Sequence, residues 1–193
     1  MLTERDRDII KWIENYKLIT IEQCGYIFFN RSYEGARRRL LQLEKNYNKI
    51  KSYRLKETNE KVYYIQKKSS YHNVLVINYV KSIVKNGGGI IDLKLTPKYL
   101  GGKIIPDAFL IFEYDNKVYF TLLEVDLFHE TSNSKMQTYE ELYKSLELQD
   151  ICCGKFPIIV IAKDSVRLRY NSSNFPVVYM DLQYRNISSL LLL

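Results

Sequence analysis

The sequence has few of the residues on which metal centres and disulfide frameworks depend. Its 193 residues include three cysteines and two histidines. No pair of cysteines has the C-x-x-C spacing of a zinc site, and the odd number with an adjacent pair, Cys152 and Cys153, argues against a set of disulfides. These absences predict reduced thiols, and they argue against a Cys/His metal cluster or a histidine-based catalytic triad.

Long apolar runs are also absent. No stretch approaches the roughly 20 consecutive apolar residues that a membrane-spanning helix needs. The start, MLTERDRDII, lacks the basic region and apolar centre of a signal peptide. Because 46% of the residues are hydrophobic and 13% aromatic, the chain still has enough apolar side chains for a substantial core. We therefore expect a globular cytoplasmic protein with no membrane association.

Positive charge is concentrated in the first third of the chain. Residues 1–68 contain 16 Lys and Arg against 9 Asp and Glu, a net charge of +7, whereas residues 69–193 contain 13 of each. Most of the non-specific affinity of a protein for nucleic acids comes from basic side chains that neutralise phosphates. A segregated basic region is therefore typical of a module that binds a polyanion. The alternative is a basic surface that only keeps the protein in solution.

Three short helices are predicted in the first 46 residues. The first covers about Glu4 to Tyr16, and the second follows Thr20; each begins with a capping box, and apolar residues then recur at helical spacing. The third follows Ser32, with Ala36, Leu40 and Leu43 facing inward and Arg37, Arg38 and Gln42 facing outward. At 100° per residue, Arg39 is expected to lean back toward the other helices.

A basic β-hairpin is predicted next, with strands at 50–55 and 61–66 around the polar sequence ETNE. Helix, helix, arginine-bearing helix and hairpin, in this order, indicate a winged helix-turn-helix, whose third helix enters the major groove of double-stranded DNA. A similar domain used for protein contacts is the alternative. The residues expected to bind DNA are Arg31, Ser32, Tyr33, Arg37, Arg38 and Gln42 on the helix, and Lys49, Lys51, Arg54, Lys56 and Lys61 on the hairpin.

The remaining residues predict a second domain, so that the chain is an α+β protein divided into residues 1–68 and 69–193. A helix from Ser70 to about Lys85 opens this domain. Strands are expected at 89–96, 104–113, 117–127, 156–162 and 177–180, with a helix at 134–148 and a short polar helix from Ser165. This order indicates an α/β sandwich with a central mixed sheet.

Three acidic residues lie on two of these strands, in the segment PDAFLIFEYDNKVYFTLLEVD. Because residues two apart share a strand face, Glu124 and Asp126 are expected to project together while Leu123 and Val125 face a helix layer. Asp107 begins the neighbouring strand. Paired acids are costly to desolvate unless a cation, a basic side chain or water satisfies them. Two uses fit: a divalent metal site for phosphodiester cleavage, or a solvated or salt-bridged face without chemistry.

The acidic residues resemble those of the PD-(D/E)xK nuclease fold. Pro106-Asp107 and Glu124 match its motif, which implies that Asp107 and Glu124 would hold Mg²⁺. Asp126 stands where the family has the lysine that assists the attacking water. A nuclease would therefore need another lysine for this role, such as Lys94, Lys135 or Lys144, because any cation near the attacking water would serve.

The whole chain resembles the replication-relaxation family of plasmids and integrative elements, in which a winged helix precedes a degenerate nuclease-like domain. The shared motifs are Pro106-Asp107-Ala108, Glu124-Val125-Asp126, and Lys135 with Tyr139 on the following helix. The resemblance implies DNA binding in replication, relaxation or conjugal mobilisation. A relaxase or replication protein is then an expected partner.

In this interpretation the second domain is non-catalytic and serves dimerisation or partner docking, and no cofactor is needed. The alternatives are a Mg²⁺-dependent nuclease with a migrated lysine and a transcriptional repressor of its own element. If any chemistry remains, its residues are expected to be Asp107, Glu124, Asp126, Lys135 and Tyr139.

Overall fold

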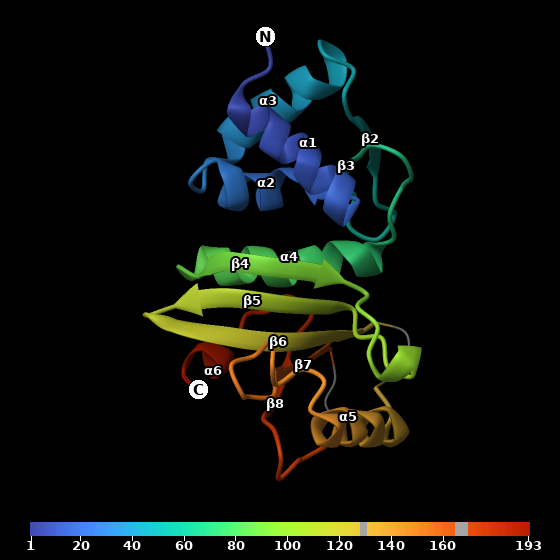
Figure 1. The fold of residues 1–193 in the computed structure, drawn as a ribbon. Coiled ribbons are helices and arrows are strands. Elements are labelled where there is room, and N and C mark those ends of the chain that lie inside the picture. The colour runs from blue at the N-terminus through green and yellow to red at the C-terminus, as the bar shows by residue number, and fades with distance from the viewer. Residues whose placement is uncertain (128–130, 165–169) are drawn as a thin grey trace. The chain divides into compact units, whose positions relative to one another are not determined.

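A computed structural model gives the fold of residues 1–127, 131–164 and 170–193. Over these residues the chain is a mixed α+β protein with six α-helices and two β-sheets (Figure 1). It divides into two compact units, Met1–Lys85 and Asn86–Leu193. None of the helices described is long and apolar enough to cross a membrane. The polar helix expected from Ser165 starts at residues outside this description.

The first unit begins with the three predicted helices: α1 (Glu4–Tyr16), α2 (Ile21–Phe28) and α3 (Tyr33–Lys45). Both expected capping boxes form, at Thr3 and at Thr20, and the Ser32 hydroxyl accepts the Gly35 N–H at the start of α3. Such caps satisfy backbone N–H groups that have no partner inside the helix. Local sequence therefore determines where these helices start.

A three-stranded antiparallel sheet completes the body of the first unit. Its strands are β1 (Ile19–Thr20), β2 (Lys51–Arg54) and β3 (Lys61–Tyr64), in the order β1-β3-β2. The predicted hairpin of β2 and β3 is confirmed. Strand β1 was not predicted, since two residues give no periodic pattern; it exists because Ile19 and Thr20 pair with Tyr63 and Val62. The core of this unit is the set Ile9, Ile13, Ile19, Cys24, Ala36, Leu40, Leu43, Ile50 and Tyr63.

Helix α4 (Tyr71–Lys85) belongs to the first unit, although the sequence-based boundary after residue 68 assigned it to the second. The Gln23 amide donates to the Val74 carbonyl at 3.2 Å and to the Asn78 side chain at 3.0 Å. Lys81 also pairs with Glu22 at 2.9 Å. These long-range polar contacts join α4 to α2 and are not visible in any local sequence pattern.

The second unit is built on a five-stranded mixed sheet in the order β4-β5-β6-β7-β8. The strands are β4 (Gly89–Leu95), β5 (Ala108–Tyr114), β6 (Lys117–Asp126), β7 (Ile158–Lys163) and β8 (Val177–Met180). The first three are antiparallel, and β7 and β8 continue parallel to β6. Strand β5 starts four residues later than predicted, because the preceding residues form a short 3-10 helix (Leu100–Gly102) and a bridge between Tyr99 and Ile104.

Helix α5 (Asn133–Ser145) packs on one face of this sheet, and α6 (Ser188–Leu191) closes the chain. Phe109 and Leu122 of the sheet share a core cluster with Met136 and Tyr139 of α5. The β6 face that carries Leu122 also carries Glu124, two residues on. Helix α5 therefore covers the β6 face that carries Leu122 and Glu124. The expectation that Leu123 and Val125 face the helix layer is wrong for this helix.

Candidate nucleic-acid interface and acidic cluster

Helix α3 presents a continuous polar face to solvent. Ala36, Leu40 and Leu43 are buried, as predicted. Exposed residues recur at helical spacing on the opposite side, and they are Glu34, Arg37, Arg38, Leu41, Gln42 and Lys45. Tyr33 is also exposed, at the start of the helix, but it does not lie on this side. The face predicted to meet DNA is thus free of core packing, and three of its six side chains are basic.

The three consecutive arginines of α3 have different partners. Arg37 donates from Nε to both carboxylate oxygens of Glu34, at 3.0 and 2.9 Å, and both side chains are exposed. The same contact lowers the pKa of Glu34 and raises that of Arg37. Arg39 instead pairs with Asp6. Arg38 is exposed and forms no ion pair with any described residue.

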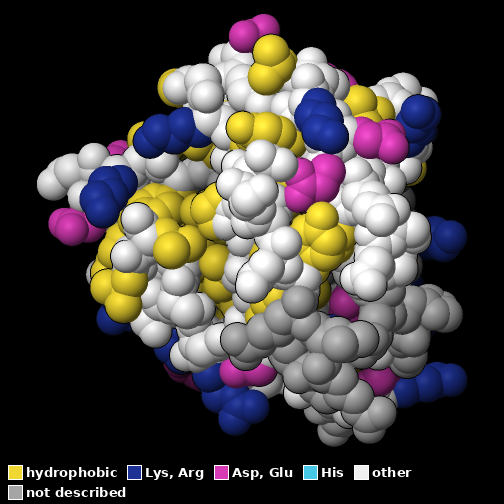
Figure 2. Space-filling view, turned by 90° about the horizontal axis from the view of Figure 1, so that it is seen from below, with side chains coloured by type: hydrophobic (Ala, Val, Ile, Leu, Met, Phe, Trp, Pro, Cys, Tyr) yellow, Lys and Arg dark blue, Asp and Glu magenta, His cyan; other side chains and the backbone are white. Residues whose placement is uncertain are grey.

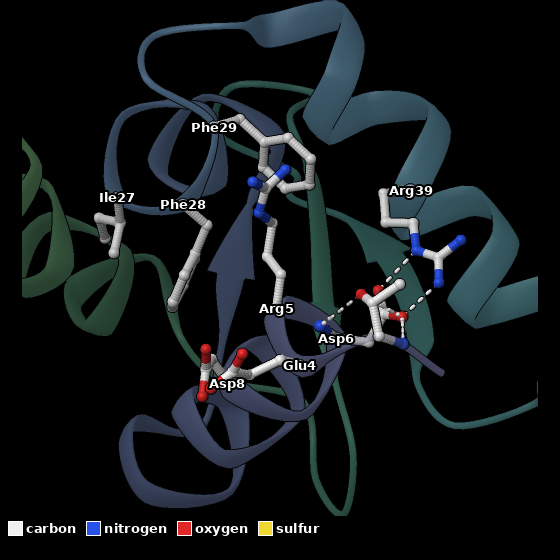
Figure 3. A pocket seen from close by; sticks show the side chains of 9 residues that line it. Glu4, Arg5, Asp6, Asp8, Ile27, Phe28, Phe29 and Arg39 are labelled. Carbon is white, nitrogen blue, oxygen red and sulfur yellow. Dashed lines mark hydrogen bonds and ion pairs between the residues drawn. The ribbon is translucent and has the colours of Figure 1, made fainter. Parts of the chain in front are cut away.

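The Asp6–Arg39 pair ties α3 to α1 at a pocket of about 720 Å³ (Figure 3). Asp6 is completely buried; its Oδ1 accepts from Arg39 Nε at 2.5 Å, and its Oδ2 accepts from the Thr3 N–H. The hydrogen bonds from Arg39 lower the pKa of Asp6 to about 2. Arg5 reaches across the pocket, with its guanidinium 4.8 Å from the Phe29 ring centre. The predicted inward lean of Arg39 is confirmed.

The predicted basic residues of the hairpin also fall into two groups. Lys49, Lys51 and Lys56 are exposed and have no ion-pair partner among the described residues. Arg54, by contrast, donates to the Asn59 carbonyl at 2.7 Å. Lys61 pairs with Glu44 of α3 at 2.8 Å. The three unpaired lysines are therefore the hairpin side chains most able to neutralise phosphates.

Three other residues predicted to bind DNA have partners inside the first unit. Arg31, with a φ of 72°, donates to the Lys85 carbonyl at 3.2 Å. Ser32 caps α3, and the Gln42 side-chain oxygen accepts from Arg39 at 2.7 Å. Each of these side chains would need to keep or exchange a structural contact in order to reach a ligand.

The division of charge is sharper between the two structural units than between the sequence-based domains. Residues 1–85 contain 18 Lys and Arg against 9 Asp and Glu, a net charge of +9. Residues 86–193 contain 11 against 13, a net charge of −2. All of the excess positive charge thus lies on the unit that carries α3 and the hairpin.

In the second unit, the structure brings Glu124 together with Lys135 and Tyr139. Glu124 is only 3% exposed. Its Oε2 accepts from Lys135 Nζ at 2.5 Å, and its Oε1 accepts from the Tyr139 hydroxyl at 2.5 Å. Burial raises the pKa of Glu124 to about 7, although the Lys135 ammonium opposes that shift. Burial and the neighbouring Glu124 raise the pKa of Tyr139 well above its usual value.

The other two acids are held by backbone groups nearby. Asp107 Oδ2 accepts the Val125 N–H at 2.8 Å, so that it bridges the start of β5 to the end of β6. Asp126 accepts from the N–H and the hydroxyl of Thr131, both at 2.7 Å. Asp126 is therefore engaged with the segment that leads into α5.

Of the three lysines considered as replacements for the nuclease lysine, Lys135 contacts Glu124. Lys94 instead lies 3.7 Å from Asp92, and Lys144 is exposed near the end of α5. Sequence reasoning missed Lys163, which is 7% exposed and pairs in register with Asp126 across β6 and β7. The only available signal was its place at the end of the apolar run FPIIVIA.

The described structure holds the predicted metal ligands in hydrogen bonds to the protein itself. Asp107 and Glu124, the predicted ligands, already accept hydrogen bonds from protein donors, and each Glu124 oxygen is contacted by a different side chain. Within residues 1–127, 131–164 and 170–193, no three His, Cys, Asp or Glu side chains are grouped so that they could hold a metal. Hard cations such as Mg²⁺ need oxygen ligands, whereas Lys135 places an ammonium group against this carboxylate.

Hydrophobic side chains are also exposed on the second unit, beside a cavity of about 630 Å³. Figure 2 shows such side chains gathered toward the left of one face, the side on which Figure 1 shows α6. Val118 and Leu193 are 50% and 58% exposed. The cavity is lined in part by Val118, Phe120, Tyr143, Lys155, Phe156 and Leu193.

Comparison of the chain with protein-family models, curated proteins and solved structures gives no significant match.

Proposed function

We propose that the protein binds double-stranded DNA through its first unit, with α3 in the major groove and the β2–β3 hairpin along the phosphate backbone. The observation that carries this proposal is a group of four exposed basic side chains on α3 and the hairpin that have no ion-pair partner among the described residues: Arg38, Lys49, Lys51 and Lys56. They lie on the outward face of α3 and on the hairpin of a unit with a net charge of +9. Unpaired cations are free to replace the counterions of DNA.

The order of elements supports a winged helix for this unit. Two capped helices precede α3, and β2 and β3 follow it as a hairpin, while β1 joins the edge of that hairpin. This placement would let α3 and the hairpin contact one duplex together. The resemblance to the replication-relaxation family supports a role in replication, relaxation or conjugal mobilisation of a plasmid or other mobile element.

For the second unit we propose a degenerate nuclease-like domain that acts in dimerisation or in docking of a relaxase or replication protein. The cluster of Glu124, Lys135 and Tyr139 supports the absence of cleavage, because the protein's own ammonium and hydroxyl groups satisfy the carboxylate. The exposed hydrophobic side chains at Val118 and Leu193 supply apolar surface for such contacts.

Binding of a fluorescent duplex, followed by anisotropy, tests the DNA proposal. The double substitution Lys49→Glu/Lys51→Glu should abolish retention at moderate salt, since two phosphate contacts become repulsive. The matched control is Lys144→Glu/Lys155→Glu, which changes two exposed lysines of the second unit by the same charge and should bind normally. Equal losses in both variants would show that only net charge matters and that the interface is misassigned.

A further inference from the structure

We infer that the three consecutive arginines of α3 have three separate roles and that Arg38 is the one that reads a base. In this division Arg39 holds the fold together and Arg37 is restrained by Glu34. The inference rests on the proposed binding of α3 in the major groove. It goes further by naming the residue that determines sequence specificity and the base that it would recognise.

The direction of each arginine follows from helix geometry. Ala36, Leu40 and Leu43 mark the buried side of α3. At 100° per residue, Arg38 lies about 15° from the direction opposite to these residues, while Arg37 lies about 90° and Arg39 about 110° from it. Arg38 is therefore directed most nearly straight away from the core. A helix that enters the major groove with this face inward places Arg38 closest to the base edges.

The ion pairs lead to the same division. Arg39 pairs with the buried carboxylate of Asp6, and its departure would leave that carboxylate buried without a partner. Arg37 makes a contact with both oxygens of Glu34, three residues earlier on the same exposed face. Arg38 forms no ion pair within the part of the chain that the structure describes, and Glu34 acts on it through charge alone, without a hydrogen bond. Its guanidinium can thus donate two N–H groups, one to guanine O6 and one to guanine N7.

An apolar side chain on the same face completes a reading surface. Leu41, three residues after Arg38, is 41% exposed. Residues three apart are neighbours on a helix surface, so Leu41 lies beside Arg38. An apolar side chain in the major groove matches the methyl group of thymine. We expect a recognised step in which a guanine stands next to a T·A base pair.

Glu34 adds a negative element to this surface. Its carboxylate repels phosphates. It also accepts hydrogen bonds from Arg37 Nε at 2.9 and 3.0 Å, and these hold Arg37 back from the phosphates. Removal of this charge would release Arg37 to contact the backbone without regard to sequence. Glu34→Gln should therefore bind random DNA more tightly and with a salt dependence that is steeper by about one phosphate contact.

Selection from a random-sequence duplex library tests the inference with the full-length protein. Wild-type protein should enrich a motif containing a guanine. Arg38→Ala should lose preference at that position by roughly 10- to 100-fold, and Arg38→Lys, which keeps the charge but not the two-pronged fork, should restore little of it. Arg37→Ala is the matched control and should keep the motif. Unchanged thermal unfolding of each variant shows that the fold is intact.

The outcomes separate this inference from the proposed function. Loss of the motif in Arg37→Ala, its retention in Arg38→Ala, or full rescue by Arg38→Lys would overturn the assignment while DNA binding stands. Binding of the library by wild-type protein without enrichment of any motif would also overturn it. Failure of wild-type protein to retain any duplex would instead overturn the proposed function.

Discussion

Glu124 lies away from water between the Lys135 ammonium and the Tyr139 hydroxyl, and burial raises its pKa from an ordinary value of 4.5 to about 7. At a pH between these two values, Glu124 keeps its proton in the folded protein but has released it in the unfolded chain. Folding stability therefore falls as the pH rises through this range, and the contribution of the protonated group is lost above about pH 7. The ion pair with Lys135 reduces this loss but does not reverse it.

Glu124→Gln removes the ionisation and keeps the shape of the side chain. Between pH 5 and pH 8 the wild-type protein should lose on the order of 3 kcal/mol of unfolding free energy relative to the variant. Urea unfolding at several pH values measures the difference. Glu141→Gln, which changes an exposed acid on α5, should run parallel to wild type. A Glu124→Gln curve that also runs parallel would mean that the carboxyl group titrates normally.

The residues in and around the Glu124 site were predictable to different degrees. Asp107, Glu124, Lys135 and Tyr139 could be singled out because short motifs mark them, and the structure brings Glu124, Lys135 and Tyr139 into contact. Lys163 could not, since its approach to β6 depends on the parallel pairing of β7. Pairing between distant strands is a property of the fold rather than of local sequence.

At the scale of elements, the Asp6–Arg39 pair joins α1 to α3 across 33 residues of sequence. Asp6→Asn should lower the unfolding free energy by about 2 kcal/mol at pH 7, since Arg39 loses its partner but keeps some access to solvent at 22% exposure. The effect should be present above pH 3.8 and disappear as the pH falls through about 2, because the pKa of Asp6 is lowered in the folded state.

Chemical denaturation of Asp6→Asn and Glu34→Gln compares two carboxylate–arginine pairs on the same helix. The exposed Glu34–Arg37 pair should contribute little to stability, because water and salt screen it. An Asp6→Asn variant as stable as Glu34→Gln would show that the buried pair is not what fixes α3 on α1.

Helices and hairpin strands with strong local signals were predicted close to their observed bounds. Capping boxes identified α1 and α2, and the polar, turn-prone sequence ETNE between two strand-like segments identified the hairpin. Strand β1 and the attachment of α4 were not predictable. They depend on Tyr63 and Gln23, which act at a distance in the sequence. The same holds for α5, whose position over Glu124 rather than Leu123 reverses the expected face of β6.

For the whole molecule, we predict that Mg²⁺ or Mn²⁺ will not convert supercoiled plasmid into nicked or linear forms. The reason is the geometry around Glu124, where the Lys135 ammonium and the Tyr139 hydroxyl each donate to one carboxylate oxygen. Gel analysis of the plasmid after incubation measures cleavage, and thermal unfolding with and without Mn²⁺ measures binding. Metal-dependent cleavage that Asp107→Ala abolishes would support the nuclease alternative instead.

The uneven distribution of charge, +9 on residues 1–85 and −2 on residues 86–193, has a kinetic consequence. A polyanion attracts the first unit and weakly repels the second during diffusion. Collisions through the first unit are therefore more frequent than collisions through the second. Long-range attraction of this kind acts mainly on the association rate constant. For the proposed binding to DNA, added salt should therefore lower the association rate constant more than it raises the dissociation rate constant.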